Sequence, residues 1–273
     1  MIPLSHPRAQ FVQSIAFAFI ISTIWWQLGD DQDSVQDRNG VLFFMSANGM
    51  MSSIMGVLST FGNERSTFIR DYENQLYKVG PYLFAKIACE APFYFVIPLI
   101  GATIMYFCVG FQATAAKYVN TAIVMITLNY AGMSMGLILA STFADIAVAL
   151  LVAPLIIMPL MMFSGFFLNA DSTPVYYSWI PWISPMKYAF SALATNEYTG
   201  LKLVCQPDEY IDVEINGVVT SICPFEIGEA FLETFNIEKE LTIAVCQLSL
   251  VAMTGGCIFL SFLALRNLVK RKR

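Results

Sequence analysis

The sequence predicts an all-α membrane protein with six transmembrane helices, a re-entrant segment, and a disulfide-containing external loop before the last helix. Of its 273 residues, 57% are apolar and only 13% are charged, whereas soluble domains carry about 25% charged residues. Six separate stretches contain no Asp, Glu, Lys or Arg over at least 20 residues, and a helix of about 20 residues crosses a hydrocarbon core. Basic and acidic residues also gather in different connecting segments.

The six uncharged stretches fix the expected helices. In lipid the backbone must satisfy its own hydrogen bonds, which favours helices, and the alternating segments of about 10 residues that are typical of a membrane barrel are not visible. An even number of crossings places both termini on one side of the membrane. The expected helices span about 9–28, 40–61, 82–109, 118–141, 147–168 and 241–265.

Charge sets the expected orientation. Ten of the 15 Lys and Arg residues fall on the side of the termini, among them Arg8, Arg65 and the cluster Arg266–Arg273. Fifteen of the 20 acidic residues fall in the loops of the opposite side. Since positive charge concentrates in cytoplasmic loops, we expect both termini to be cytoplasmic and the loop 169–240 to be external.

The most polar cytoplasmic segment is 62–80, between the second and third helices. Phe68, Tyr72 and Leu76 recur every four residues, which favours a short amphipathic helix. It is either an interfacial loop or a docking helix for a cytoplasmic partner. At the start of the third helix, Lys86 and Glu90 are four residues apart, which allows an ion pair.

The long external segment has two parts. Residues Ser172–Met186 carry no charge but are too few to span a bilayer, which predicts a re-entrant or interfacial segment. The acidic second part contains Asn216-Gly217, which favours a hairpin turn. It also contains Cys205 and Cys223, whose separation and oxidising surroundings suit a disulfide, within the loop or between subunits. We expect no metal site, because the only histidine, His6, lies on the other side.

Four stretches, in order, resemble the membrane domain of the G subfamily of ABC transporters, of the White, breast-cancer-resistance-protein and pleiotropic-drug-resistance type (an ABC-2 type transporter domain). The resemblance covers essentially the whole chain. It rests on Gln36–Phe44, on Asn63–Arg70 with Tyr77, on Met162–Leu168, and on Trp182–Phe190 with Asn196–Gly200.

The resemblance implies that 1–273 is one half of a transporter, whose two halves, identical or different, enclose a central cavity. It also implies an ATPase domain that binds ATP and Mg. We find neither Gly-x-x-x-x-Gly-Lys-Ser/Thr nor a Leu-Ser-Gly-Gly-Gln signature in the sequence. We therefore expect this chain to bind no cofactor and to work with a nucleotide-binding domain that it lacks, as a fragment or as a subunit.

The resemblance also assigns roles to individual positions. The segment 62–80 is implied to be a coupling segment against the ATPase domain. Phe166 and Phe167 are implied to form an apolar plug between the cavity and the exit, and Cys205 and Cys223 the intraloop disulfide. The coupling residues implied are Glu64, Arg65, Arg70 and Glu73, and the cavity residues implied are Asn48, Met51, Met158 and Met161.

The predicted function is ATP-driven export of an apolar or amphipathic cargo, such as a lipid, a sterol or a xenobiotic. The expected partners are the lipid bilayer, a second transporter half, a nucleotide-binding domain and the cargo, and the expected location is the plasma membrane. No catalytic residue is assigned. The alternative is a non-transporting regulatory subunit that pairs with a full transporter. A channel or ion-coupled carrier is disfavoured, because ionisable residues are missing near the middle of the spans.

Overall fold

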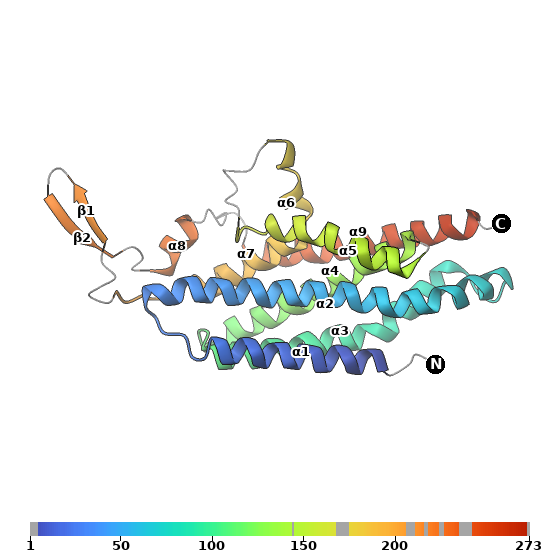
Figure 1. Ribbon diagram of the computed structural model, residues 1–273, viewed down its shortest axis with the longest axis horizontal. Helices are drawn as coiled ribbons and strands as arrows, with labels where there is room; N and C mark the ends of the chain where they lie inside the picture. Colours follow the sequence, from blue (N-terminus) through green and yellow to red (C-terminus); the bar gives the residue numbers. More distant parts are fainter. Residues whose placement is uncertain are drawn as a thin grey trace.

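The computed structural model describes residues 5–143, 145–167, 175–205, 211–215, 218–223, 227–234 and 242–271. Most of these residues lie in helices that run along one long axis (Figure 1). The helices of the bundle are α1 (Ser5–Ile24), α2 (Gln32–Glu73), α3 (Val79–Val109), α4 (Ala115–Thr142), α5 (Ile146–Met162), α7 (Pro185–Tyr198) and α9 (Ile243–Arg271). The smaller elements are a 3₁₀ turn (Val175–Tyr177), α6 (Ile180–Ile183), β1 (Ile211–Ile215), β2 (Val218–Ile222) and α8 (Gly228–Thr234).

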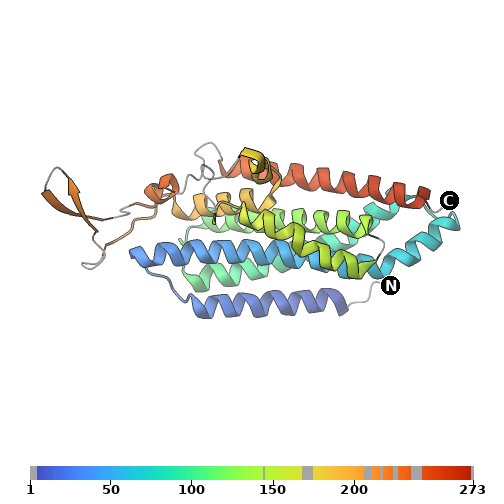
Figure 2. The same ribbon diagram turned by 45° about the horizontal axis from the view of Figure 1, so that its top comes forward.

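Four helices in the described part of the chain are long and apolar enough to cross a membrane: α2, α3, α4 and α9. Two further apolar helices, α1 and α5, are shorter. The prediction of a helical membrane protein is confirmed, while the number of crossings stays a prediction. Both ends of the chain lie at one end of the bundle, which we call the terminal end, and β1 and β2 lie at the opposite, distal end (Figures 1 and 2).

The observed boundaries differ most from the expected ones in α2, which continues to Glu73, into the segment 62–80 that was expected to hold a separate short helix or an interfacial loop. Residues 62–73 extend the helix without a break, because no proline interrupts them. The helix ends where Gln75 adopts a positive φ of 59° and the Asn74 N–H bonds back to the Arg70 carbonyl. As a result, a single rod connects the distal end to the charged terminal end.

By contrast, α5 is shorter than expected: it ends at Met162, six residues before the predicted end of that helix at residue 168. Pro154 and Pro159 already weaken its hydrogen bonding. Three residues after the end of the helix, Gly165 takes a φ of +94°, a left-handed conformation that suits glycine and keeps the chain from continuing as a helix. Phe166 and Phe167 therefore follow the helix in an irregular segment.

Glycine allows α4 to approach α2 closely. A Cβ atom on Gly136 would lie 2.9 Å from the Ile54 carbonyl oxygen, and one on Gly132 would lie 3.0 Å from the Met50 oxygen. Small residues at such a seam let two backbones meet, which is how helices associate in lipid. Next to this seam, the Ser53 hydroxyl and the Asn129 amide oxygen lie 2.6 Å apart in a hydrogen bond.

The distal segment contains the expected hairpin. β1 and β2 pair antiparallel, with Ile211 opposite Ile222 and Ile215 opposite Val218. The predicted turn residues Asn216 and Gly217 lie outside the described residues. Within the segment predicted as re-entrant, the 3₁₀ turn and α6 project from the bundle and carry exposed aromatic residues (Figures 1 and 2). The helix α7 that follows is almost entirely buried.

Candidate functional site

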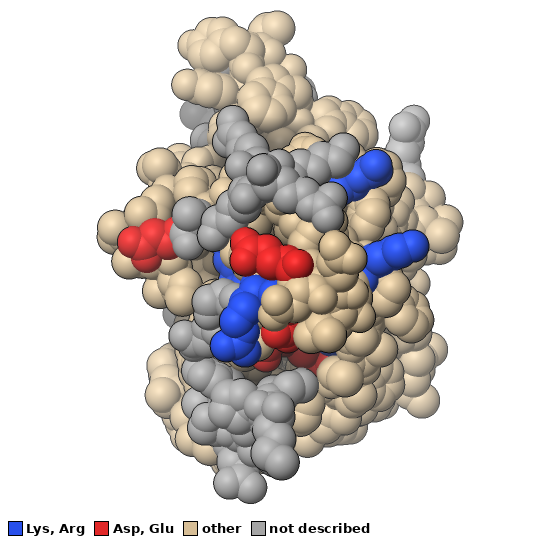
Figure 3. Space-filling model, turned by 90° about the vertical axis from the view of Figure 1, so that its right-hand side faces the viewer, with Lys and Arg blue, Asp and Glu red and all other residues tan. Residues whose placement is uncertain are grey.

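Lys86 joins α2 to α3 near the terminal end of the bundle. Its Nζ donates to Glu64 Oε2 at 2.7 Å and to Glu90 Oε1 at 2.8 Å, and it lies 5.5 Å from the centroid of the Phe61 ring. The Lys86–Glu90 pair that the spacing allows is therefore formed, and Glu64 from α2 completes a three-member cluster. Figure 3 looks onto this end, where charged side chains of both signs gather.

Arg65 is buried and directed toward the end of α4. Its guanidinium donates to the carbonyl oxygen of Phe143 and, at 3.5 Å, to that of Ala140. The last carbonyls of a helix lack intrahelical partners and carry partial negative charge, so a cation there is stabilising. Burial lowers the pKa of Arg65 from its usual value. Arg65 therefore fixes the position of α4 relative to α2.

The other two predicted coupling residues, Arg70 and Glu73, point outward. The Arg70 side chain is 73% exposed and its Nε lies 3.8 Å from Asp71 Oδ1, which is a weak pair. Glu73 is also exposed. The four residues thus divide into an inward pair that holds neighbouring helices and an outward pair that is free to meet another protein.

The connection from α2 to α3 is held by stacked aromatic rings. The rings of Phe68 and Tyr82 are stacked at 4.1 Å between centroids, and those of Tyr77 and Tyr82 at 5.8 Å. The Tyr77 hydroxyl donates to Asp71 Oδ2 at 3.0 Å. Burial raises the pKa of Tyr77, and the hydrogen bond to Asp71 raises it further. Leu76, predicted to share a face with Phe68, is instead 69% exposed because it lies beyond the end of the helix.

The four predicted cavity residues also separate. Met51 on α2 and Met158 on α5 are 43% and 67% exposed, and Met161 is half-buried against the core. Asn48 instead lines a small pocket inside the bundle, with Pro98 of α3 and Asn129 of α4. The structure therefore places the two exposed methionines, and not Asn48, on the outside of this half.

Met51 and Met158 belong to a larger apolar surface on the neighbouring helices α2 and α5, which we call the outward face. Along α5 the buried positions recur every three or four residues and face the core, while most positions between them are exposed. The outward face comprises Phe44 and Met51 on α2 and Leu151, Leu155, Met158 and Met162 on α5. Its exposed positions, at helical spacing, form a stripe for another apolar surface or for lipid.

Phe166 and Phe167 continue this surface toward the distal end. Phe166 stacks on Phe43 of α2 with centroids 4.5 Å apart, and Phe167 meets Phe43 edge-on at 5.0 Å. Phe166 also contacts Phe190 of α7 at 5.9 Å. The predicted plug pair is thus part of a four-ring cluster. The sequence reasoning did not assign Phe43 or Phe190 to it, although both lie in the stretches that carry the family resemblance.

A buried ion pair at the distal end was also missed. Arg38 Nη1 donates to Glu197 Oε1 at 2.6 Å, and the two side chains are 2% and 3% exposed. Arg38 also donates to the Gly29 carbonyl at 3.0 Å, and the Gln112 N–H donates to the Glu197 carboxylate at 3.3 Å. Burial raises the pKa of Glu197, and the neighbouring Arg38 charge opposes that shift. The pair joins α2, α7 and two connecting loops.

Its signal was present in the sequence, because Arg38 and Glu197 lie in two of the four quoted stretches. Beside this pair, the Tyr198 hydroxyl donates to the carbonyl of Val35, the residue just before the first stretch, at 2.7 Å. Single-sequence reasoning offers no reason to pair residues that are 159 positions apart.

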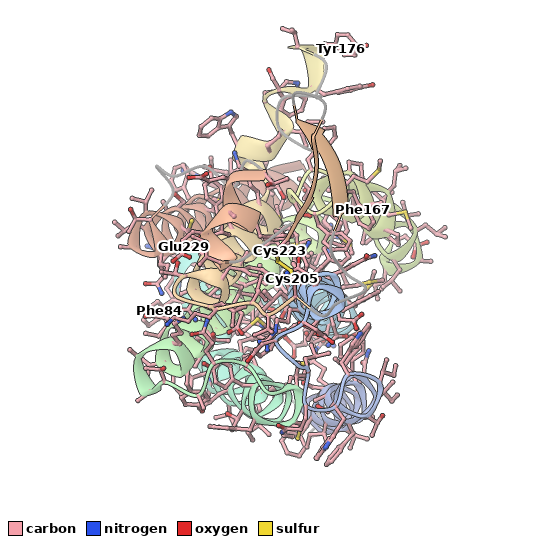
Figure 4. The ribbon with its side chains drawn as sticks, turned by 90° about the vertical axis from the view of Figure 1, so that its left-hand side faces the viewer. Phe84, Phe167, Tyr176, Cys205, Cys223 and Glu229 are labelled. Atoms are coloured by element: carbon pink, nitrogen blue, oxygen red, sulfur yellow. A yellow bond between two sulfur atoms is a disulfide. The ribbon has the colours of Figure 1, made fainter. Side chains whose placement is uncertain are left out.

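Cys205 and Cys223 form the intraloop disulfide, with Cα atoms 6.1 Å apart (Figure 4). This confirms the pairing within the loop and not the alternative between subunits. Figure 4 also shows Phe167 at the side of the bundle and Tyr176 projecting away from it. Of the four other cysteines, Cys246 is buried and Cys89 is exposed on α3.

Comparison with known proteins identifies the family of this chain. Residues 3–198 match the ABC-2 type transporter family. The chain is 30% identical over 200 residues to "ABC transporter G family member 7" of Arabidopsis thaliana, covering 73% of this chain and 27% of that protein. It is 26% identical over 265 residues to "Protein white" of Drosophila melanogaster, covering 97% of this chain and 37% of that protein.

A third relative is "Broad substrate specificity ATP-binding cassette transporter ABCG2" of Mus musculus, 31% identical over 201 residues, or 72% of this chain and 30% of that protein. The chain thus spans between 27% and 37% of the length of these relatives. Taken with the apolar helices and the outward face, the match shows that this chain belongs to the ABC-2 type transporter family, as a membrane domain of the G subfamily.

Proposed function

We propose that this chain is the membrane-spanning half of an ATP-driven exporter of an apolar or amphipathic cargo, such as a lipid, a sterol or a xenobiotic. The observation that carries the proposal is the outward face, where Met51 and Met158 expose flexible apolar side chains. Methionine adapts to ligands of varied shape. Two such faces, brought together across a two-fold axis, enclose an apolar cavity.

ATP and Mg are proposed to bind a nucleotide-binding domain outside this chain, at the terminal end. Arg70 and Glu73 present exposed charges there for contact with that domain. Glu64 and Arg65 then transmit the movement, because they tie α2 to α3 and to α4. Movement of the domain would therefore shift several helices together and not one segment alone.

Release of the cargo is proposed to occur past Phe166 and Phe167. Their contacts with Phe43 and Phe190 close the distal end of the outward face with apolar rings. The disulfide loop lies beyond them on the external side, with both termini cytoplasmic and the plasma membrane as the site of action. Closure of the two halves expels cargo when ATP binding favours the closed state over the open one.

The test is ATP-dependent uptake of fluorescent sterol, phospholipid and xenobiotic probes into inside-out vesicles that contain the protein with its ATPase domain. Reversing both outward charges, in Arg70→Glu with Glu73→Lys, places like charges across the contact. We expect uptake to fall at least about tenfold, which corresponds to about 1.4 kcal/mol of lost contact energy. Thermal stability should stay unchanged, because both side chains are exposed.

The matched control is Lys202→Glu, a reversal at an exposed residue after α7 and outside the segment 62–80, which should leave uptake unchanged. Normal uptake by the double variant would remove the coupling role. If none of the three probe classes moves with ATP in the unaltered protein, the exporter proposal fails and the regulatory subunit takes its place.

A further inference from the structure

Two adjoining pockets lie between α1, α2, α3 and α4, at the middle of the apolar spans. Both are lined by Ser52 of α2, Pro98 of α3 and Asn129 of α4, and one of them also by Asn48. Asn48, Tyr94 and Asn129 lie at the centres of the apolar spans of α2, α3 and α4. Lipid at that depth offers no hydrogen-bond partner, so polar groups there must find their partners within the protein.

The polar groups around Asn129 do not all find a partner among one another. Ser53 has a single hydroxyl proton, and two acceptors lie close to it: Asn129 Oδ1 at 2.6 Å and the Gly49 carbonyl at 2.8 Å. One proton serves only one of them well. Asn129 Nδ2 donates to the Met125 carbonyl at 2.7 Å, which leaves the second N–H of this buried amide for another acceptor. A molecule that both donates and accepts would complete the set.

Pro98 removes a hydrogen-bond donor from α3 at the same depth. Proline has no N–H, so the carbonyl of Tyr94, four residues earlier, receives no helical hydrogen bond from it. Tyr94 and Pro98 line the same pocket. Prolines in membrane helices are tolerated where neighbouring side chains or ordered water satisfy the freed carbonyl. The Tyr94 hydroxyl is itself directed to the Ser53 carbonyl, at 3.5 Å.

The size of the pockets selects the ligand. Each gives about 20 Å³ to the centre of a water molecule, and about 10–15 Å³ is enough to hold one. A lipid, a sterol or a xenobiotic is far larger. Polar side chains from α1, α2 and α4 line both pockets, whereas cavities that stay dry are lined by apolar groups.

We propose that each pocket binds one ordered water molecule, and that the two waters bridge Asn129 and Ser52 to α1 and to the Tyr94 carbonyl. The two sites do not depend on the proposed transport function. Asn48 is then a partner of bound water between the helices. A hydrogen bond through water is nearly as favourable as a direct one, so α3 can bend at Pro98 without leaving a carbonyl unpaired.

The test is hydroxyl-radical labelling of the purified full-length protein in lipid nanodiscs. X-ray pulses convert water, including bound water, into hydroxyl radicals, and a methionine beside such a water becomes the sulfoxide, which mass spectrometry detects. Met45, Met105 and Met125 line one pocket and are at most 4% exposed. The matched controls, Met50 and Met133, are equally buried but line neither pocket. We expect the three lining methionines to be oxidised several-fold faster than the two controls.

Pocket-filling variants complete the test. Ser52→Leu fills the space common to both pockets and should lower oxidation of the lining methionines to the level of the controls. Ser59→Leu replaces a serine of the same helix that also bonds to a backbone carbonyl of α2 but lines neither pocket, and it should leave the labelling unchanged. Asn48→Leu fills the pocket of the three methionines from a second position, which guards against misfolding of Ser52→Leu.

Two results would overturn the proposal. The first is equal oxidation of lining and control methionines in the unaltered protein, which needs no variant to fold. The second is fast oxidation of the lining methionines that persists in either pocket-filling variant while its thermal stability is unchanged.

Discussion

The two sides of α2 are built in opposite ways. Toward α4 and α7 the helix meets glycine at Gly132 and Gly136, a hydrogen bond to Asn129, and the buried ion pair of Arg38 with Glu197. Toward α5 it carries the outward face, where Met51 is 43% exposed. One side is closed by contacts within the chain, and the other ends in uncovered apolar side chains.

The side of α2 that faces α4 and α7 holds this transporter half together, whereas the side that carries the outward face is left for a partner or a cargo. Close backbone approach and buried polar pairs leave little freedom, because interiors are close-packed and a buried charge needs its partner. Exposed methionines lack such constraints. We therefore expect substitutions on the closed side to change stability and substitutions on the outward face to change transport.

The largest effect is expected from Arg38→Met, which leaves the Glu197 carboxylate buried without its counter-charge. Breaking a buried pair in this way costs about 3–5 kcal/mol, to be measured as a loss of thermal stability in detergent. The control is Asp30→Asn, which removes the other acidic partner of Arg38 but one that is 58% exposed; its cost should be about 0–1 kcal/mol. Equal losses in the two variants would contradict the closed-side assignment.

Gly136→Leu should come next. The new side chain would meet the Ile54 backbone of α2, and overpacking of this kind costs about 1–3 kcal/mol. The comparison is Gly255→Leu on α9, where an added Cβ meets nothing within 4 Å. Thermal unfolding of both variants measures the difference. If Gly136→Leu were as stable as Gly255→Leu, the seam would not hold α2 to α4.

Arg65→Met and Arg70→Met test the inward and outward pairs at the terminal end. Loss of the Arg65 hydrogen bonds to the end of α4 should cost about 1–3 kcal/mol, because those carbonyls lose a charged donor. Arg70 is largely exposed, and its replacement should leave unfolding within about 0.5 kcal/mol of the unaltered protein. If Arg70→Met unfolded at a lower temperature than Arg65→Met, Arg65 would not be the residue that holds α4 against α2.

The smallest effect on stability is expected from Met51→Ala with Met158→Ala. Both side chains are exposed, so the folded half should change by less than about 1 kcal/mol. Cargo uptake should nevertheless change several-fold, because two flexible apolar contacts are lost. Leu248→Ala on α9, whose side chain is 69% exposed, serves as a control with no expected effect on uptake. Unchanged uptake by the double variant would place the cavity elsewhere.

Much of the fold follows from the sequence because the bilayer imposes simple rules. A run of uncharged residues as long as the hydrocarbon is thick predicts a helix, and each of the six predicted stretches overlaps an apolar helix among the described residues. The ends of the helices were harder to predict, because segments outside the hydrocarbon core are not bound by the same rule. The segment after Gly62 is polar enough for a loop, yet it extends α2 because no proline interrupts it and because Arg65 and Glu64 find partners at the end of α4 and on α3.

The candidate sites show the same division. Local spacing was enough to predict that Lys86 can pair with Glu90, one turn away on the same helix, and that Cys205 can pair with Cys223. It could not divide Glu64 and Arg65 from Arg70 and Glu73, since all lie within ten residues on one helix. Which side of that helix meets another helix depends on where the other helix packs.

By itself, the sequence determined that this protein is a bundle of membrane helices with a disulfide-linked loop before the last helix, because hydrophobicity, charge and cysteine spacing act locally. Only the tertiary structure decided that Arg38 meets Glu197, that Lys86 serves two carboxylates, and that Met51 and Met158 stay uncovered. Those outcomes depend on close packing between segments distant in the chain, and no local pattern encodes which of several apolar faces a given helix will bury.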